Sequence, residues 1–157
     1  MSNKRDMVTT FIIDQQKNLY RFAYSYVRNI DTAMDLVQDM TIKAIHKANG
    51  LRDEATVKGW IYRILANECL MYLRKQKKME FVEYVDEMNE GKLEDESINN
   101  VIDNLPSNLR AIIFLKFQED MTIKEIATIL GENENTIKSR YYKALKLLRI
   151  EMEDTDE

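Results

Sequence analysis

Residues 122–149 carry polar and cationic side chains at spacings typical of a DNA-reading helix. Thr122 and Asn133 are residue types that cap helix N-termini, and Gly131 lies where a helix often ends in a left-handed residue. The pattern therefore predicts a helix-turn-helix. Its second helix would bury an apolar stripe consisting of Ile137, Tyr141, Ala144, Leu145 and Leu148.

The outward side of that second helix consists of hydrogen-bonding and cationic residues, namely Asn135, Lys138, Ser139, Tyr142, Lys143 and Lys146. Such groups suit the base edges and phosphates of a DNA groove. The alternative is an ordinary helical hairpin with a solvated polar face. The coincidence of a small residue, a glycine and an N-cap at the expected positions favours DNA binding.

A second candidate nucleic-acid surface lies in the segment 57–78, where aromatic and donor side chains interleave: Trp60, Tyr62, Arg63, Asn67, Tyr72 and Arg74. Aromatic faces stack on unpaired bases and arginines hold the backbone, so this combination suits single-stranded nucleic acid. The competing interpretation, preferred for this segment alone, makes Trp60 a core anchor and the two tyrosines amphipathic cover for the bundle.

Support for catalysis is weak. His46 is the only histidine and Cys69, the only cysteine, lies on a predicted core face, so neither a Cys/His pair nor a zinc site of the usual ligands can be assembled. Asp35 and Asp39 lie one helical turn apart and are better explained as a solvated or partner-facing surface. We expect no catalytic residues, no metal and no cofactor.

Charge is segregated along the 157 residues, although the net charge is only −4. Six basic residues against one acid give +5 over 57–78, and six against three give +3 over 122–149. Eight acids against one lysine give −7 over 79–100, and five acids give −5 over 150–157. Local charge steers a polyanion, so the two basic segments are where we expect DNA.

The fold class predicted is all-α. Four glycines and one proline supply few turn residues for a many-stranded sheet. The longest apolar run, 111–115, is too short to span a membrane. A start without the apolar core of a signal peptide and a single cysteine indicate a cytoplasmic protein without membrane insertion.

The pattern divides the chain into two small helical domains, 1–78 and 101–150, joined by an acidic linker, 79–100, and followed by an acidic, frayed tail, 151–157.

Within the domains, apolar spacing predicts a helix over about 5–28, broken near Asp14, and another capped by Asp31 and running to Ala48. A polar loop, 49–56, then precedes a helix over about 57–78. Pro106 and Ser107 begin a further helix, whose inner face would consist of Leu109, Ile112, Ile113 and Phe117.

Three segments together resemble an extracytoplasmic-function (ECF) sigma factor, the compact two-domain class of bacterial transcription initiation factors. Residues 35–44, DLVQDMTIKA, resemble the core-polymerase-binding helix of that family. Residues 60–67, WIYRILAN, with 72–78, YLRKQKK, resemble its promoter-melting helix. Leu105-Pro106 with 122–127, TIKEIA, and 136–140, TIKSR, resemble its minus-thirty-five-reading domain.

The resemblance implies roles for residues of the first domain. Asp35, Gln38 and Asp39 would face core RNA polymerase. The 49–56 loop would hold a flipped promoter base. The minus-ten strand would be contacted by Trp60, Arg63, Asn67 and Arg74. Glu68 is unusual on a helix that faces DNA.

For the second domain, the resemblance implies a minus-thirty-five interface formed by Asn135, Lys138, Ser139, Arg140, Tyr142 and Lys143. The expected partners are core RNA polymerase, promoter DNA and an anti-sigma factor, the last of them membrane-linked. The acidic linker would thread toward the interior of the polymerase. Two alternative functions remain: a helix-turn-helix transcriptional regulator, and a sigma-like adaptor that binds a protein without promoter specificity.

Overall fold

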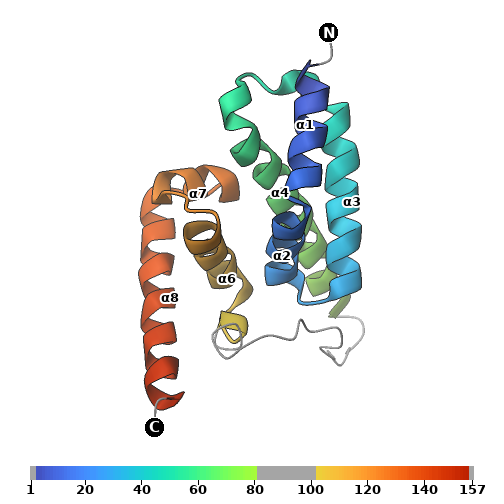
Figure 1. Ribbon diagram of the computed structural model, residues 1–157. Coiled ribbons are helices and arrows are strands. Elements are labelled where there is room, and N and C mark those ends of the chain that lie inside the picture. The colour runs from blue at the N-terminus through green and yellow to red at the C-terminus, as the bar shows by residue number, and fades with distance from the viewer. Residues whose placement is uncertain (1–2, 81–101, 156–157) are drawn as a thin grey trace. The chain divides into compact units, whose positions relative to one another are not determined.

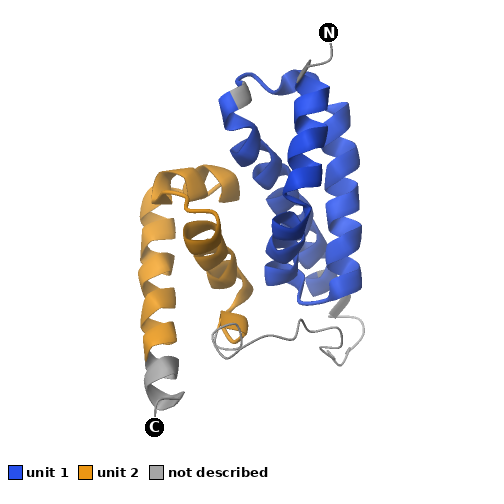
Figure 2. Ribbon diagram, in the orientation of Figure 1, with its two compact units in different colours: residues 1–92 blue, residues 93–157 orange. Residues whose placement is uncertain are grey.

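The computed structural model describes residues 3–80 and 102–155, and the chain divides into two compact units, residues 1–92 and 93–157 (Figure 2). All regular structure in the described residues is helical, as the all-α prediction requires. None of the helices in the described part of the chain is long and apolar enough to cross a membrane.

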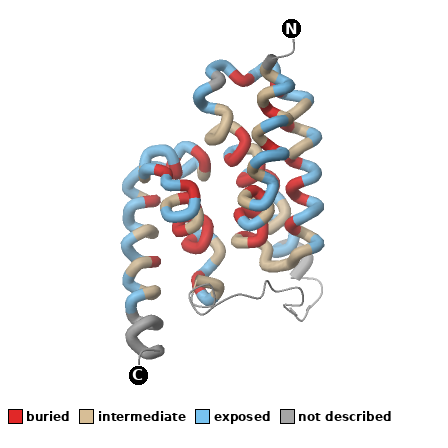
Figure 3. Tube along the Cα trace, in the orientation of Figure 1, coloured by how far each residue is buried: buried red, intermediate tan, exposed pale blue. Residues whose placement is uncertain are grey.

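Unit 1 is a bundle of α1 (Asn3–Asp14), α2 (Gln16–Val27), α3 (Ile30–His46) and α4 (Val57–Glu80) (Figure 1). Its core is formed by large side chains that are fully buried, including Leu19, Phe22, Met40, Ile61 and Leu65. In Figure 3 the buried positions recur along each helix with exposed ones between them, which is the pattern of helices that pack by one face. The break predicted near Asp14 is confirmed, because Gln15 separates α1 from α2.

The start of α3 differs from the prediction. The capping residue is Asn29, whose side-chain oxygen accepts a hydrogen bond from the Thr32 backbone N–H at 2.9 Å. Asp31 instead lies exposed in the first turn, where its charge favours the positive end of the helix dipole. The chain reaches this cap through Arg28, whose left-handed backbone (φ 54°) turns the chain sharply and begins the helix two residues earlier than expected.

Helix α4 buries two side chains, Tyr62 and Glu68, that the sequence analysis did not place in the interior. Tyr62 is fully buried, with its ring edge-on to Phe22 at a centroid distance of 5.2 Å, so it neither covers the bundle nor stacks on bases. Glu68 is buried as well and pairs with Lys43 of α3. This ion pair explains an acid on α4, because its carboxylate faces α3 and not the solvent.

Unit 2 contains α6 (Ser107–Ile113), the π-helical turn η3 (Phe114–Gln118), α7 (Ile123–Leu130) and α8 (Glu134–Thr155). Pro106 precedes α6 directly, as predicted. A hydrophobic cluster joins α6 to α8 and consists of Leu105, Leu109, Ile113 and Ala144, with Tyr141, Leu145 and Leu148 packed against it. The guanidinium of the buried Arg110 donates to the Leu105 carbonyl, which fixes the turn that leads into α6.

The prediction that Phe117 belongs to the inner face of its helix is wrong. The side chain is 62% exposed, and Leu115 is the buried residue of this turn. The cause is the π-helical backbone, in which the Glu119 N–H donates to the carbonyl of Phe114, five residues earlier. The wider turn shifts the side chains after Ile113 out of the α-helical register on which the prediction relied.

The acidic tail was expected to be frayed, but α8 continues through Thr155. Residues 151–153, Glu-Met-Glu, are good helix formers, so they extend a helix that packing has already nucleated. Nearly all of the predicted acidic linker falls within residues 81–101, which lie outside the described residues.

Candidate nucleic-acid and partner interfaces

The helix-turn-helix of unit 2 is built by caps at three positions. Thr122 and Glu125 form a reciprocal capping box, with hydrogen bonds of 3.1 and 2.8 Å. Gly131 ends α7 in the left-handed conformation (φ 69°), which glycine adopts at little cost. The Asn133 side chain then accepts from the Thr136 N–H at 2.9 Å. These local bonds set the direction of α8 as it leaves α7, and they confirm the predicted caps.

Five of the six predicted minus-thirty-five residues lie exposed on α8: Asn135, Lys138, Ser139, Tyr142 and Lys143. They recur every three or four residues, so they share one side of the helix, opposite the buried Ile137 and Ala144. The sixth, Arg140, is half-buried, and its Nη1 lies 3.5 Å from an oxygen of Glu132. The helix thus presents amide, hydroxyl and ammonium groups together, with one arginine already paired to an acid.

An aromatic cluster lies beside this face. The Tyr141 ring lies 5.5 Å from Tyr142 and 6.2 Å from Phe117, measured between centroids. Tyr142 is 57% exposed, so the cluster extends from the core to the surface. Sequence reasoning missed the exposed Phe117, because only the π-helical turn brings it to this place.

On α4 of unit 1, three of the predicted single-strand contacts are exposed: Arg63, Asn67 and Arg74. Their spacings of four and seven residues place them on one stripe of the helix. Trp60 is half-buried at the edge of this stripe. It therefore keeps part of its ring available for stacking while the rest packs against the bundle.

The loop before α4 combines an anchored centre with an open rim. Leu51 is fully buried and holds the segment between the short helices η1 (Ala48–Gly50) and η2 (Glu54–Thr56). Asp53 shapes the second half, because its side chain accepts from the Ala55 N–H and its carbonyl accepts from the Thr56 hydroxyl. The residues on both sides of Leu51 are exposed.

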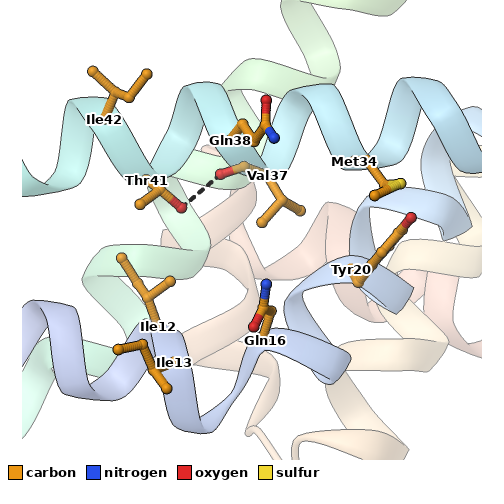
Figure 4. Close-up of a pocket in the computed structure, with 9 residues that line it drawn as sticks. All are labelled: Ile12, Ile13, Gln16, Tyr20, Met34, Val37, Gln38, Thr41 and Ile42. Carbon is orange, nitrogen blue, oxygen red and sulfur yellow. Dashed lines mark hydrogen bonds between the residues drawn. The ribbon is translucent and has the colours of Figure 1, made fainter.

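On α3, the three predicted polymerase contacts, Asp35, Gln38 and Asp39, are all exposed and lie within two turns of the helix. Gln38 lines a groove between α3 and the α1–α2 pair, with a volume of about 400 Å³, whereas Asp35 and Asp39 are not among its lining residues. Figure 4 shows Gln38 on the α3 wall of this groove, with Gln16 and Tyr20 on the opposite wall. Polar side chains thus lie next to an open apolar surface.

Sequence reasoning missed the apolar residues of this groove. Ile13, Met34 and Ile42 are 64%, 45% and 58% exposed, and because all three line one groove they form an apolar patch. Tyr20 donates to the Ile30 carbonyl at 3.4 Å, and burial together with the nearby charge of Asp31 raises the pKa of its hydroxyl. The only signal in the sequence was the presence of isoleucines and a methionine off the buried stripes.

The two residues considered for catalysis, Cys69 and His46, lie in different environments. Cys69 is fully buried, and desolvation, with the neighbouring Glu68 charge, raises the pKa of its thiol far above the ordinary range. His46 is exposed at the end of α3. Among the described residues, no group of three or more His, Cys, Asp or Glu side chains is arranged to hold a metal ion.

Comparison with known proteins agrees with this arrangement. Residues 12–79 match the family model of Sigma-70 region 2, and residues 95–148 match that of Sigma-70 region 4. The RNA polymerase sigma factor SigV of Bacillus subtilis is 40% identical over 96% of this chain and 93% of its own. The ECF sigma factor SigW of the same organism is 24% identical over 91% and 88%.

A solved structure of the sigma factor RpoE from Bartonella quintana, in complex with the anti-sigma factor NepR, is also similar. It has a TM-score of 0.77 and 25% identity, covering 92% of this chain and 96% of that one. Two small helical units, one with a helix-turn-helix and one with a basic aromatic helix, define a sigma-type initiation factor. The chain belongs to the ECF RNA polymerase sigma factors.

Proposed function

We propose that this protein works in the cytoplasm as an initiation factor, not an enzyme by itself, that directs core RNA polymerase to specific promoters by reading two DNA elements. The observation that carries the proposal is that each unit exposes, on one helix, a stripe of donor and cationic side chains suited to nucleic acid: Arg63, Asn67 and Arg74 on α4, and the face of α8 around Lys138. Family membership supplies the context in which two such faces act together.

The face of α3 is the proposed site for core polymerase. Asp35, Gln38 and Asp39 offer two carboxylates and an amide for a basic partner surface, while the adjoining groove offers apolar area to bury. A polar rim around an apolar centre is the usual composition of a specific protein interface. Ile13 and Ile42, exposed in the free protein, would then be covered in the complex.

Helix α4 is the proposed reader of the melted minus-ten strand. Flipping a base costs a few kilocalories per mole of stacking, which stacking on an aromatic ring can recover by about 1–3 kcal/mol per base. Trp60, half-buried at the edge of the stripe, is suited to this stacking, and Asn67 is suited to hydrogen bonding with a base edge. The 49–56 loop would receive the extruded base.

Helix α8 is the proposed reader of the minus-thirty-five element in the major groove. Lys138 and Lys143 carry charge for phosphates or base edges, while Asn135, Ser139, Arg140 and Tyr142 supply directional donors. We also propose that an anti-sigma factor, membrane-linked, holds the protein inactive. The similarity to a sigma factor solved together with an anti-sigma factor supports this partner.

The deciding experiment is run-off transcription with purified core polymerase and fragmented genomic DNA of the source organism. We expect discrete, promoter-dependent transcripts only when the protein is present. A regulator or an adaptor without promoter specificity would instead leave the pattern of start sites made by core enzyme unchanged, and that result would refute the proposal.

The same holoenzyme tests the role of α4 by permanganate reactivity of promoter thymines. Trp60→Ala should impair opening of duplex promoters, and a pre-melted bubble should rescue it, because the loss is in melting. Asn67→Ala should be rescued less, because the loss is in recognition. If both variants open duplex DNA as well as the parent, this stripe of α4 has no part in reading DNA.

A further inference from the structure

The ion pair between Glu132 and Arg140 joins the turn of the helix-turn-helix to its second helix. Glu132 lies between Gly131 and Asn133, outside α8, and its backbone N–H donates to the Ala127 carbonyl at 3.1 Å. This bond fixes the Glu132 backbone at the end of α7. The Glu132 carboxylate then lies 3.5 Å from Nη1 of Arg140, two turns into α8.

The pair is not needed to hold the fold. Both side chains are partly exposed, at 34% for Arg140 and 42% for Glu132, and ion pairs at such positions contribute little to stability. The turn is already determined by the left-handed Gly131 and by the Asn133 cap. An acid here should moreover repel phosphates from the face that approaches DNA. Glu132 therefore opposes nucleic-acid binding unless the orientation that it imposes on Arg140 compensates for its charge.

We propose that Glu132 is a positioning residue that makes Arg140 a reader of base edges instead of a phosphate contact. This inference rests on the proposed function of α8. A guanidinium has five N–H donors in a planar fork, and the Glu132 carboxylate pairs with it at Nη1, on one edge of that fork. An arginine paired on one edge favours orientations in which its remaining donors face away from that pair, and such a biased fork suits the O6 and N7 acceptors of guanine. A freely rotating arginine would instead follow the nearest phosphate.

The chain offers a matched control. Glu134 is an exposed acid two residues further along, in the first turn of α8, and its neutralisation removes the same charge from the same end of the helix. Glu134→Gln therefore measures the effect of charge alone. Glu132→Gln measures the effect of charge together with loss of the carboxylate that holds Arg140.

The experiment uses holoenzyme, made from core polymerase and the full chain. Its probes are two labelled duplexes: a promoter mapped by the run-off transcription above, and the same fragment with its upstream element scrambled. The measured quantity is the dissociation constant for the scrambled duplex divided by that for the promoter duplex. Thermal unfolding of each variant checks that it is folded. Glu134→Gln should strengthen binding to both duplexes and leave the ratio unchanged. Glu132→Gln should lower the ratio about tenfold, as expected for loss of one oriented base contact.

A double-mutant comparison isolates the path of the effect. In an Arg140→Ala background, Glu132→Gln should no longer change the ratio, because the side chain that it positions is absent. Two results would overturn the inference: a ratio for Glu132→Gln equal to that of Glu134→Gln, or a fall in the ratio that persists without Arg140. Absence of any preference in the parent holoenzyme would refute the proposed function itself, which distinguishes the two failures.

Discussion

The buried pair between Lys43 and Glu68 tests how α3 and α4 are held together. The Glu68 side chain is 8% exposed, while that of Lys43 is 44% exposed, so the carboxylate is desolvated and its partner is not. Lys43→Met would leave a buried charge without its cation. Breaking a fully buried pair costs about 3–5 kcal/mol. Since one partner is nearly half exposed and water can replace it in part, we expect a loss of about 1–3 kcal/mol in the free energy of unfolding.

The asymmetry of the pair makes the double variant informative. Lys43→Met combined with Glu68→Leu removes both the charge and its partner, and an apolar pair of similar shape should restore most of the stability. Glu68→Gln keeps the shape without the charge and should cost less than Lys43→Met. Reversal of this order would mean that the unpaired buried charge is not the main cost of Lys43→Met.

The assay is urea denaturation followed by tryptophan fluorescence. Trp60 is the only tryptophan and lies on α4, so its signal reports unit 1 even if the two units unfold separately. If Lys43→Met shifts stability by less than about 0.5 kcal/mol, the range of ordinary surface substitutions, then Glu68 is solvated in solution and the reasoning from burial fails.

Three further predictions follow from particular positions. Gly59→Ala should raise the free energy of unfolding by about 0.5–1 kcal/mol, because nothing lies within 4 Å of the added methyl group in α4; destabilisation in the same urea assay would contradict this. Asp39→Arg should weaken core-polymerase binding by about 2–5 kcal/mol in a fluorescence titration, whereas reversing the exposed Asp6 on α1 should not; equal affinities would place the interface elsewhere. Cys69 should resist thiol reagents in the native protein. Because folding raises the pKa of its thiol, the contribution of Cys69 to the free energy of unfolding should be complete below about pH 8.5 and should fall above it, by up to about 1.4 kcal/mol per pH unit. The Cys69→Ala variant should lack this fall.

The caps of the helix-turn-helix in unit 2 could be predicted because their causes are local. The capping box at Thr122, the left-handed Gly131 and the Asn133 cap each depend on residues within three positions, and the structure contains all three. Asp31 shows the limit of the same reasoning. Asn29 and Asp31 are both good capping types, and the choice between them depends on the left-handed backbone of Arg28. The local sequence does not indicate that conformation.

Burial was harder to predict where it depends on packing between helices. Tyr62 is adjacent to the buried Ile61 and could belong either to the core or to its border, and only the position of Phe22 on α2 decides it. The groove beside α3 is a similar case. Ile13 and Ile42 lie off the buried stripes of two different helices, but the spacing along either helix does not indicate that both line one groove.

The geometry of α4 explains why one of two neighbouring polar residues is exposed and the other is buried. Asn67 and Glu68 are neighbours in the sequence, yet a step of about 100° per residue places one in solvent and the other against α3. The acid that seemed to oppose DNA binding is therefore directed inward, where Lys43 neutralises it. Its removal from the surface leaves Arg63 and Arg74 as the charges on the exposed stripe. In its proposed role as a reader of DNA, α4 carries this acid at little electrostatic cost because the acid ties the helix to its own bundle, so the pair serves the stability of unit 1 without opposing affinity for a polyanion.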